Sequence, residues 1–476
     1  MSIQEHKSQG MPLTARQRGM VFACLLAASV ASSFQITALS TALPAIVRDL
    51  GIDFSAGQWL TSGFSLAMGI VMPLTAFLIT RIPTRPLLLT SMGAILLGLV
   101  LCVIARGFSL MMFGRVLQAC GNGMLTSITQ VVVLTIFPSE KRGAMMGWYG
   151  LAVGAAPVIA PTLAGVLVDS FGWGMIFYAA IAMIALCLVW AFVVSSNMLE
   201  TKVQAFDIQS FLLSALAFGG ITLGIGNAAG QGLREPMAFV PLLAGVIAGL
   251  FFARRQLRLE QPFLELRVLR SRQYAISVAA SMLLYLVMMG VSLLMPLYIQ
   301  SVMGHSATLS GLVTLPGALC MAATSPFAGR ILDRLGMKKL FVTGAVCLLL
   351  GTAGMVPIAG IISVWPAAIL HAVRCIAIGC LLMPLVTWGM SSLTPDQTAH
   401  GTALVNSLRT IAGAIGAAVF TGIMTSVAKA AAATHGAGAQ IYGVQIAFFV
   451  MSLVAAVLLI LAVLGVKHQG ENQFAR

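Results

Sequence analysis

Long runs of apolar residues alternate with short polar segments along almost the whole chain. Each run is about 20 residues long, the length that a helix needs to cross a bilayer core. Strands of a membrane barrel would be about ten residues long and would alternate polar with apolar positions, which these runs do not do. The pattern predicts fourteen membrane-spanning helices, at residues 20–44, 57–79, 86–105, 109–134, 143–168, 175–195, 209–228, 236–253, 273–297, 307–329, 338–360, 364–390, 401–425 and 440–466.

Composition agrees with an all-α polytopic membrane protein. The 476 residues are 59% hydrophobic and only 8% charged, whereas a soluble domain carries about 25% charged residues. All eight cysteines fall inside apolar runs, where they act as small hydrophobic side chains. We therefore expect neither a disulfide framework nor a metal site.

The basic residues indicate the orientation. Net charge is +14, but the charges are scattered over short loops without interleaved aromatic residues, so nucleic acid is not an expected partner. With both termini in the cytoplasm, 20 of the 27 lysines and arginines lie in cytoplasmic segments and four in outer loops. Positive charge collects on the cytoplasmic side of membrane proteins. The sequence therefore predicts a multi-pass protein of the inner membrane with both termini cytoplasmic.

A basic loop occurs twice. Residues 329–339 read Gly-Arg-Ile-Leu-Asp-Arg-Leu-Gly-Met-Lys-Lys, and residues 76–86 are a degenerate copy in which Arg81 aligns with Arg334 and Arg85 with Lys338. A carboxylate beside helix ends can make charged contacts in one conformation that are lost in another. We expect a conformational switch at Arg81, Arg85, Gly329, Asp333, Arg334, Gly336 and Lys338.

The positions of the two copies predict the domain organisation. The first copy follows the second apolar run, and the second copy follows the tenth run, not the eighth. Two helices are therefore inserted between two six-helix halves, an internal repetition typical of secondary transporters. We expect an N-terminal bundle at 1–200, an inserted pair with a basic linker at 201–272, and a C-terminal bundle at 273–476.

Arg115 lies in the middle of an apolar run. A central arginine costs roughly 2.5–3.5 kcal/mol on insertion scales, so it should face a partner or a polar cavity. Gln118 and Asn122 follow at helical spacing and share its face. The pattern favours a role in a substrate or proton pathway. The alternative is a structural arginine that holds backbone carbonyls.

Three further features bear on the pathway. Pro157 and Pro161 interrupt a run rich in small residues, which predicts a bent, closely packed helix, although ordinary tight packing would give the same pattern. His371 and Arg374 lie one turn apart, where the histidine either titrates or is simply hydrogen-bonded. Arg409 follows Asn406, and we interpret it as a structural anchor.

Together these motifs resemble the fourteen-helix drug:proton antiporters of the major facilitator superfamily. The resemblance rests on Thr41-Ala-Leu-Pro44, on Arg115 with Gln118, Gly121 and Gly123, on Gly154, Pro157, Pro161 and Gly165, on Pro296 to Gln300, and on Asn406 with Arg409. It implies a major facilitator fold and a proton role for Arg115. The chain departs from the family at Gln35 and Thr80, where aspartates are usual.

The expected function is secondary transport. No phosphate-binding loop or catalytic motif is present in the sequence, so neither an enzyme nor a cofactor is predicted. We expect export of amphipathic or drug-like small molecules through a cavity between the halves. Its walls should include Gln35, Arg115, Gln118, Asn122 and parts of the spans at 143–168, 273–297 and 364–390. An importer of a small metabolite and a sensor without flux remain alternatives. An envelope adaptor is a further candidate partner.

Proton coupling is the least determined part of this expectation. None of the thirteen acidic residues lies in the middle of a predicted span, so the usual carboxylate is missing. Either His371 titrates in its place, or transport runs without tight proton coupling. The second reading is favoured, because the positive charge of Arg374 opposes protonation of a histidine one turn away.

Overall fold

A computed structural model describes residues 14–52, 54–199, 206–231, 235–305, 307–358 and 363–466. Within these residues every regular element is helical. The long helices are α1 (Ala15–Asp49), α2 (Phe54–Arg81), α3 (Thr84–Ile104), α4 (Phe108–Ile136), α5 (Ser139–Phe171), α6 (Gly174–Val194), α7 (Ile208–Gln231), α8 (Pro236–Arg258), α9 (Arg272–Leu297), α10 (Ala307–Leu335), α11 (Met337–Ala353), α13 (Trp365–Met390), α14 (Thr398–His435) and α15 (Ala439–Gly465).

Each predicted span corresponds to one long helix, which confirms the fourteen-helix count. The span at 338–360 is α11 continued by the short α12 (Met355–Ile358) after Gly354. Among the described residues, thirteen helices are long and apolar enough to cross a membrane. Several helices run past the predicted ends, because polar caps and loop residues extend them. α14 is the longest, at 38 residues.

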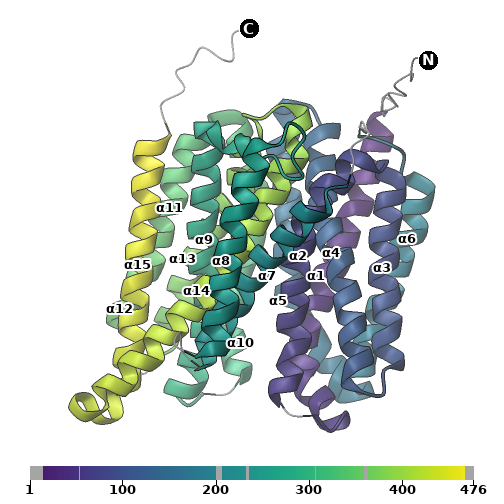
Figure 1. The fold of residues 1–476 in the computed structure, drawn as a ribbon. Coiled ribbons are helices and arrows are strands. Elements are labelled where there is room, and N and C mark those ends of the chain that lie inside the picture. The colour runs from purple at the N-terminus through teal and green to yellow at the C-terminus, as the bar shows by residue number, and fades with distance from the viewer. Residues whose placement is uncertain are drawn as a thin grey trace, which may run out of the picture.

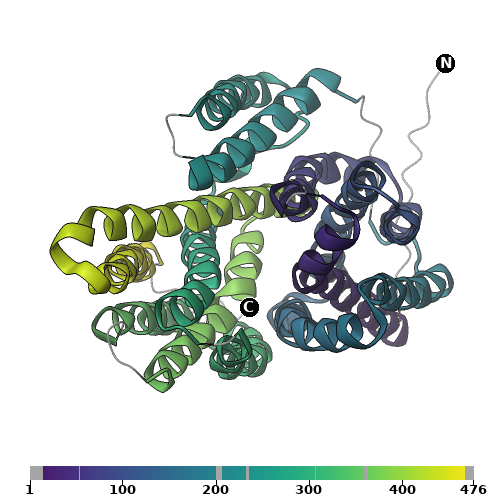
Figure 2. The ribbon, with the colours of Figure 1, turned by 90° about the horizontal axis from the view of Figure 1, so that it is seen from below.

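The helices form two bundles that lie side by side (Figures 1 and 2). One buried apolar cluster is built mostly from α1 to α6, and the other mostly from α9 to α15 with contributions from α2, α4 and α5 at the seam. Each bundle thus has its own core. The seam between the bundles is where a ligand could be held without breaking either core.

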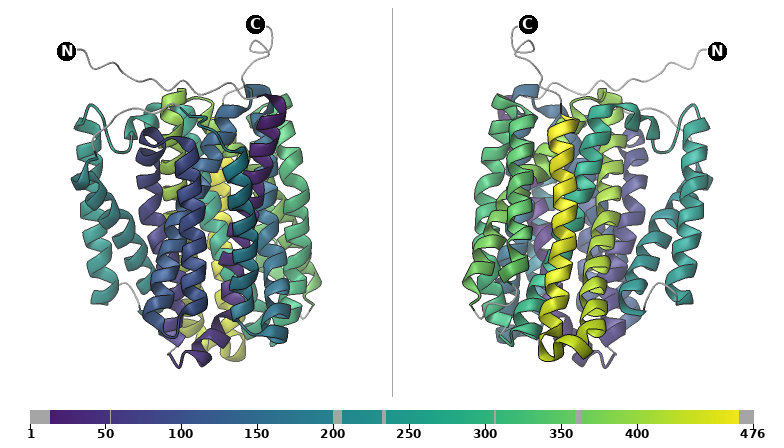
Figure 3. Two further views of the ribbon diagram at one scale, coloured as in Figure 1. Left: turned by 90° about the vertical axis from the view of Figure 1, so that its right-hand side faces the viewer. Right: turned by 90° about the vertical axis from the view of Figure 1, so that its left-hand side faces the viewer.

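The α7–α8 pair lies outside the two bundles, as both views in Figure 3 show. α7 packs against α8 and also contacts α2 and α14. The pair is clamped at one end, where the Arg255 guanidinium binds the Asp207 carboxylate at 3.1 Å and the Ser210 hydroxyl donates to the same carboxylate at 2.6 Å. Burial raises the pKa of the Asp207 carboxyl, but the hydrogen bonds from Ser210 and Arg255 outweigh burial and leave this pKa below its ordinary value.

Both copies of the basic loop lie at one end of the molecule, which we call the basic end. α2 and α10 finish there, at Arg81 and Leu335. Gly336 has φ +75° and forms the N-cap of α11. This left-handed conformation suits glycine, which has no Cβ, so Gly336 allows the tight turn between α10 and α11.

Candidate functional site

A cavity of about 180 Å³ lies between the two bundles. Its walls come from α1, α2, α4 and α5 on one side and from α9, α13 and α14 on the other. Arg409 in this wall is eleven residues into α14 from Thr398, about 17 Å from the basic end at 1.5 Å per residue. The cavity therefore lies near the middle of a core about 30 Å thick. We call it the central cavity.

Polar side chains from both bundles meet in the central cavity. The Arg409 guanidinium donates a hydrogen bond of 2.7 Å to the Tyr285 hydroxyl and lies 4.1 Å from the centre of that ring. Asn406 on α14 donates to Gln130 on α4 at 3.2 Å and so links the bundles. Tyr149 on α5 adds a further hydroxyl.

Sequence reasoning missed Tyr285, Tyr149 and Gln130 as cavity residues. Gln130 follows Asn122 and Thr126 at intervals of four, so helical spacing could have indicated it. The two tyrosines gave no such signal, because a tyrosine in an apolar run is an ordinary membrane residue. Arg409, which the sequence suggested as an anchor, is the only charged side chain in the described wall of the cavity.

Arg115 is buried inside the first bundle, with 1% of its surface exposed. Its Nε donates to the Leu60 carbonyl at 3.0 Å, and its Nη1 donates to the Gln118 side chain at 2.6 Å. The guanidinium also lies 4.3 Å from the centre of the Phe64 ring. All these partners belong to α2 and α4, so Arg115 ties two helices of one bundle together.

A chain of hydrogen bonds leads from Arg115 to the central cavity. Asn122 donates to the Gln118 carbonyl at 3.0 Å, and Ser32 on α1 donates to the Asn122 side chain. Ser32 lies in the cavity wall. Arg115 therefore connects to the cavity through Gln118, Asn122 and Ser32.

Residues of α5, α9 and α13 line the cavity as expected, but four expected side chains do not. Gln35, Arg115, Gln118 and Asn122 are outside the residues that form it. The three α4 residues share a face, as their spacing predicts, but that face packs inside the first bundle, where Arg115 bonds to Leu60 of α2 and Asn122 to Ser32 of α1. The neighbouring glycine face of α4 packs against α3. A Cβ at Gly121 would lie 2.5 Å from the Ser91 carbonyl oxygen of α3. Gln35 is 4% exposed, and its amide has no hydrogen-bond partner among the described residues.

Asp333 joins the two bundles at the basic end. One carboxylate oxygen accepts from the Gly143 amide at 2.9 Å, and the other accepts from the Ala144 amide at 2.7 Å. Gly329 lies one turn earlier on α10 and packs closely against Gly143. A Cβ added at Gly329 would collide with the Gly143 carbonyl oxygen. We call this contact between α10 and α5 the Asp333 clasp.

The other residues of the predicted switch lie apart from the clasp. Arg85 donates to the Phe192 carbonyl at 3.0 Å and so ties α3 to α6, while Arg81 lies 5.7 Å from the centre of the Phe77 ring on its own helix. Arg334 is exposed, and Lys338 is partly buried. The Thr80 hydroxyl donates to the Phe77 carbonyl of the same helix at 2.8 Å.

Two of the remaining predicted pathway residues, His371 and Arg374, lie outside the described wall of the central cavity. The His371 and Arg374 side chains are hydrogen-bonded to each other on α13, and Gly317 of α10 lies against the imidazole. A guanidinium has only donors, so His371 Nδ1 is the acceptor. Pro157 and Pro161 fall within α5, and their side chains lie outside the described part of the structure.

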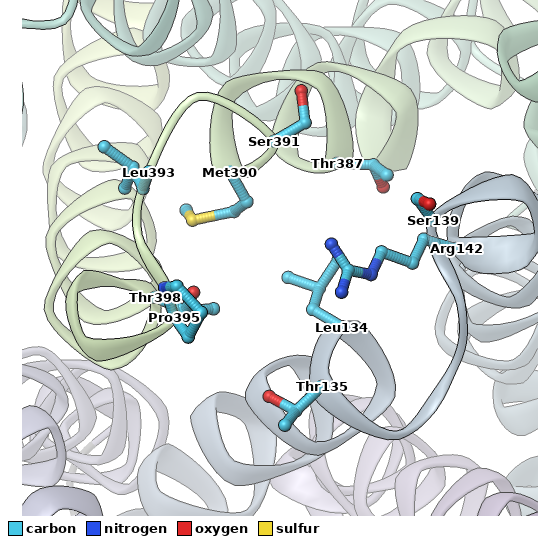
Figure 4. A pocket seen from close by; sticks show the side chains of 10 residues that line it. All are labelled: Leu134, Thr135, Ser139, Arg142, Thr387, Met390, Ser391, Leu393, Pro395 and Thr398. Carbon is cyan, nitrogen blue, oxygen red and sulfur yellow. The ribbon is translucent and has the colours of Figure 1, made fainter. Parts of the chain in front are cut away.

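A second cavity, of about 200 Å³, lies nearer the basic end (Figure 4). It is built from the ends of α4 and α13 and the beginnings of α5 and α14. Arg142 lines it, and its Nε donates to the Phe137 carbonyl at 3.1 Å. Leu134 and Thr387 in this wall lie four residues beyond Gln130 and Met383 of the central cavity. The two cavities therefore follow one another along the same seam.

Comparison with known proteins gives consistent matches. The Major Facilitator Superfamily model matches residues 25–417. An uncharacterized MFS-type transporter of Bacillus subtilis, YcnB, is 35% identical over 96% of this chain and 98% of its own length. The lincomycin resistance protein LmrB of the same organism is 33% identical over 84% of each chain.

A solved structure shows the same fold. The human organic anion transporter MFSD10 has a TM-score of 0.64 at 15% identity, over 94% of this chain and 99% of that one. At this identity the likeness concerns the arrangement of the helices and not the ligand.

Proposed function

The chain belongs to the major facilitator superfamily, and on that premise we propose that it is a secondary transporter that exports amphipathic, drug-like molecules by alternating access. The observation that carries this proposal is the central cavity, whose walls come from both bundles near the middle of the membrane. A ligand held between two rigid bundles can be exposed to either side as they rock. The likeness to a lincomycin resistance protein over most of its length supports export of toxic compounds.

The proposal extends to topology and partners. We place residues 1–200 in the first bundle, 201–272 in the inserted pair and its linker, and 273–476 in the second bundle. We place both termini in the cytoplasm, with the basic end facing inward, because most basic residues gather there. Protons are a candidate coupling ion, and an envelope adaptor is a candidate partner.

Two experiments test export. A host strain lacking its own pumps would express the protein and be screened for growth across toxic compounds, and the purified protein would be tested for flux of the resulting hits in proteoliposomes. Export predicts higher resistance and downhill flux of the same compound. Binding without flux would favour the sensor, and higher sensitivity would favour an importer.

A further inference from the structure

The Arg409 guanidinium in the central cavity is incompletely partnered. Only 3% of this side chain is exposed. Its Nη2 donates to the Tyr285 hydroxyl, while Nε and Nη1 have no hydrogen-bond partner among the described residues. Leaving buried charged donors unpaired is costly. Arg409 therefore places an incompletely partnered permanent cation in the wall of the central cavity.

The remainder of the described wall does not neutralise this charge. It contains no carboxylate, and its polar groups are hydroxyls and amides from residues such as Thr410, Tyr149 and Gln130. Asn406 and Gln130 are already bonded to each other. The group that best matches an incompletely partnered guanidinium is an oxyanion, which accepts charge-assisted hydrogen bonds from its N–H groups.

The other part of the wall is apolar and adaptable. Met68, Met72 and Met383 face the cavity together with Leu125 and Val153. Methionine side chains are flexible and polarisable and fit varied apolar shapes. At about 180 Å³ the cavity is smaller than the roughly 300–1,000 Å³ of sites for drug-sized ligands. The cavity therefore has room for a ligand with a compact apolar body.

We propose that the central cavity binds an amphipathic organic monoanion, in which a carboxylate or sulfonate pairs with the Arg409 guanidinium and a compact apolar body lies against the methionines. This inference rests on the proposed transport function, because it names the substrate class of the same cavity. An organic cation would meet like charge without a carboxylate to offset it.

The first test measures charge selectivity of the wild-type protein. Three ring-matched probes would be bound to the purified protein: 4-toluenesulfonate, the neutral 4-toluenesulfonamide and the cationic benzyltrimethylammonium. We expect the sulfonate to bind at least about tenfold more tightly than the other two, as a charge-assisted hydrogen bond to Arg409 implies. Equal binding of the three, or preference for the cation, would overturn the proposal.

The second test changes the guanidinium. We expect Arg409→Gln to weaken sulfonate binding roughly ten- to a hundredfold and Arg409→Lys to weaken it less, while sulfonamide binding stays the same. Arg106→Gln removes the same charge from an exposed loop and should leave both affinities unchanged. Unchanged sulfonate affinity in a folded Arg409→Gln protein would contradict the proposal. If that variant does not fold, wild-type selectivity and Arg409→Lys decide the matter.

Counterflow in proteoliposomes separates this inference from the proposed function. If sulfonate binding depends on Arg409 but no probe shows flux, the anion site is supported and the proposed transport function is contradicted. If the probes show flux without preference for the anion, the transport function is supported and the anion site is contradicted.

Discussion

The Asp333 carboxylate on α10 lies 2.7 Å from the Ala144 amide nitrogen on α5, although 189 residues separate them in the chain. Together with the Gly143 amide, this contact holds the two bundles at the basic end. Hydrogen bonds to a charged group contribute about 1.5–3 kcal/mol each. The clasp is therefore strong enough to shift the equilibrium between two conformations.

We expect Asp333→Asn to leave expression intact and to lower transport about tenfold or more. An asparagine keeps one acceptor oxygen but turns an NH2 group toward the second backbone amide. Thr80→Ala should have little effect, since the Thr80 hydroxyl donates to the Phe77 carbonyl of its own helix. Flux per correctly folded protein would be measured for both variants. Equal loss in both would contradict the asymmetry between the two loop copies.

The predicted topology can be tested with reporter fusions after residues 200, 260 and 470. All three should report the cytoplasm, because fourteen crossings return the chain to its starting side and the inserted pair returns it to the same side before α9. A periplasmic signal at residue 260 would contradict the prediction that the inserted pair crosses the membrane twice.

The helices were predictable from the sequence because run length and loop charge are local properties. The direction in which the polar face of α4 points could not be predicted in this way. Spacing places Arg115, Gln118 and Asn122 on one face, but the direction of that face depends on how α4 packs against α1, α2 and α3. The partners of Asp333 were equally hidden, because backbone amides of α5 carry no signature in the sequence.

Arg115→Lys should fold but transport poorly. A lysine presents a compact charge and cannot hold both the Leu60 carbonyl and Gln118 in the fixed geometry of a guanidinium. The hydrogen-bond chain to Ser32 would then lose its position. Flux and thermal stability would be measured together. A large loss of stability with normal flux per folded protein would make Arg115 purely structural.

His371 is not expected to carry the coupling proton. Protonation would place a proton on Nδ1, which accepts from the Arg374 guanidinium, and would replace a hydrogen bond by repulsion. Substrate-induced proton release should therefore be the same in wild type and His371→Gln. Release in both would reveal another coupling group, whereas loss only in the variant would make His371 the site. Flux without release in either protein would indicate transport without tight proton coupling.

Acid should loosen the α7–α8 clamp. The pKa of Asp207 is lowered in the folded protein, so its contribution to stability is complete above the ordinary value of 3.8 and is lost as pH falls through the lower folded pKa. The effect should be below about 1 kcal/mol, because the pair is partly solvent-exposed. Thermal unfolding between pH 3 and pH 6, at about half-unit steps, should show a smaller acid sensitivity in Asp207→Asn than in wild type.

The close approach of Gly143 and Gly329 in the clasp has a mechanical consequence. Where two helices touch backbone to backbone, no side chain lies between them that could change rotamer and absorb a displacement. The contact therefore acts as a rigid stop that fixes how far the bundles can close at the basic end. We expect this limit to be the same whatever molecule occupies the cavity, so that ligands of different shape can be accommodated by the flexible methionines without changing the closed geometry.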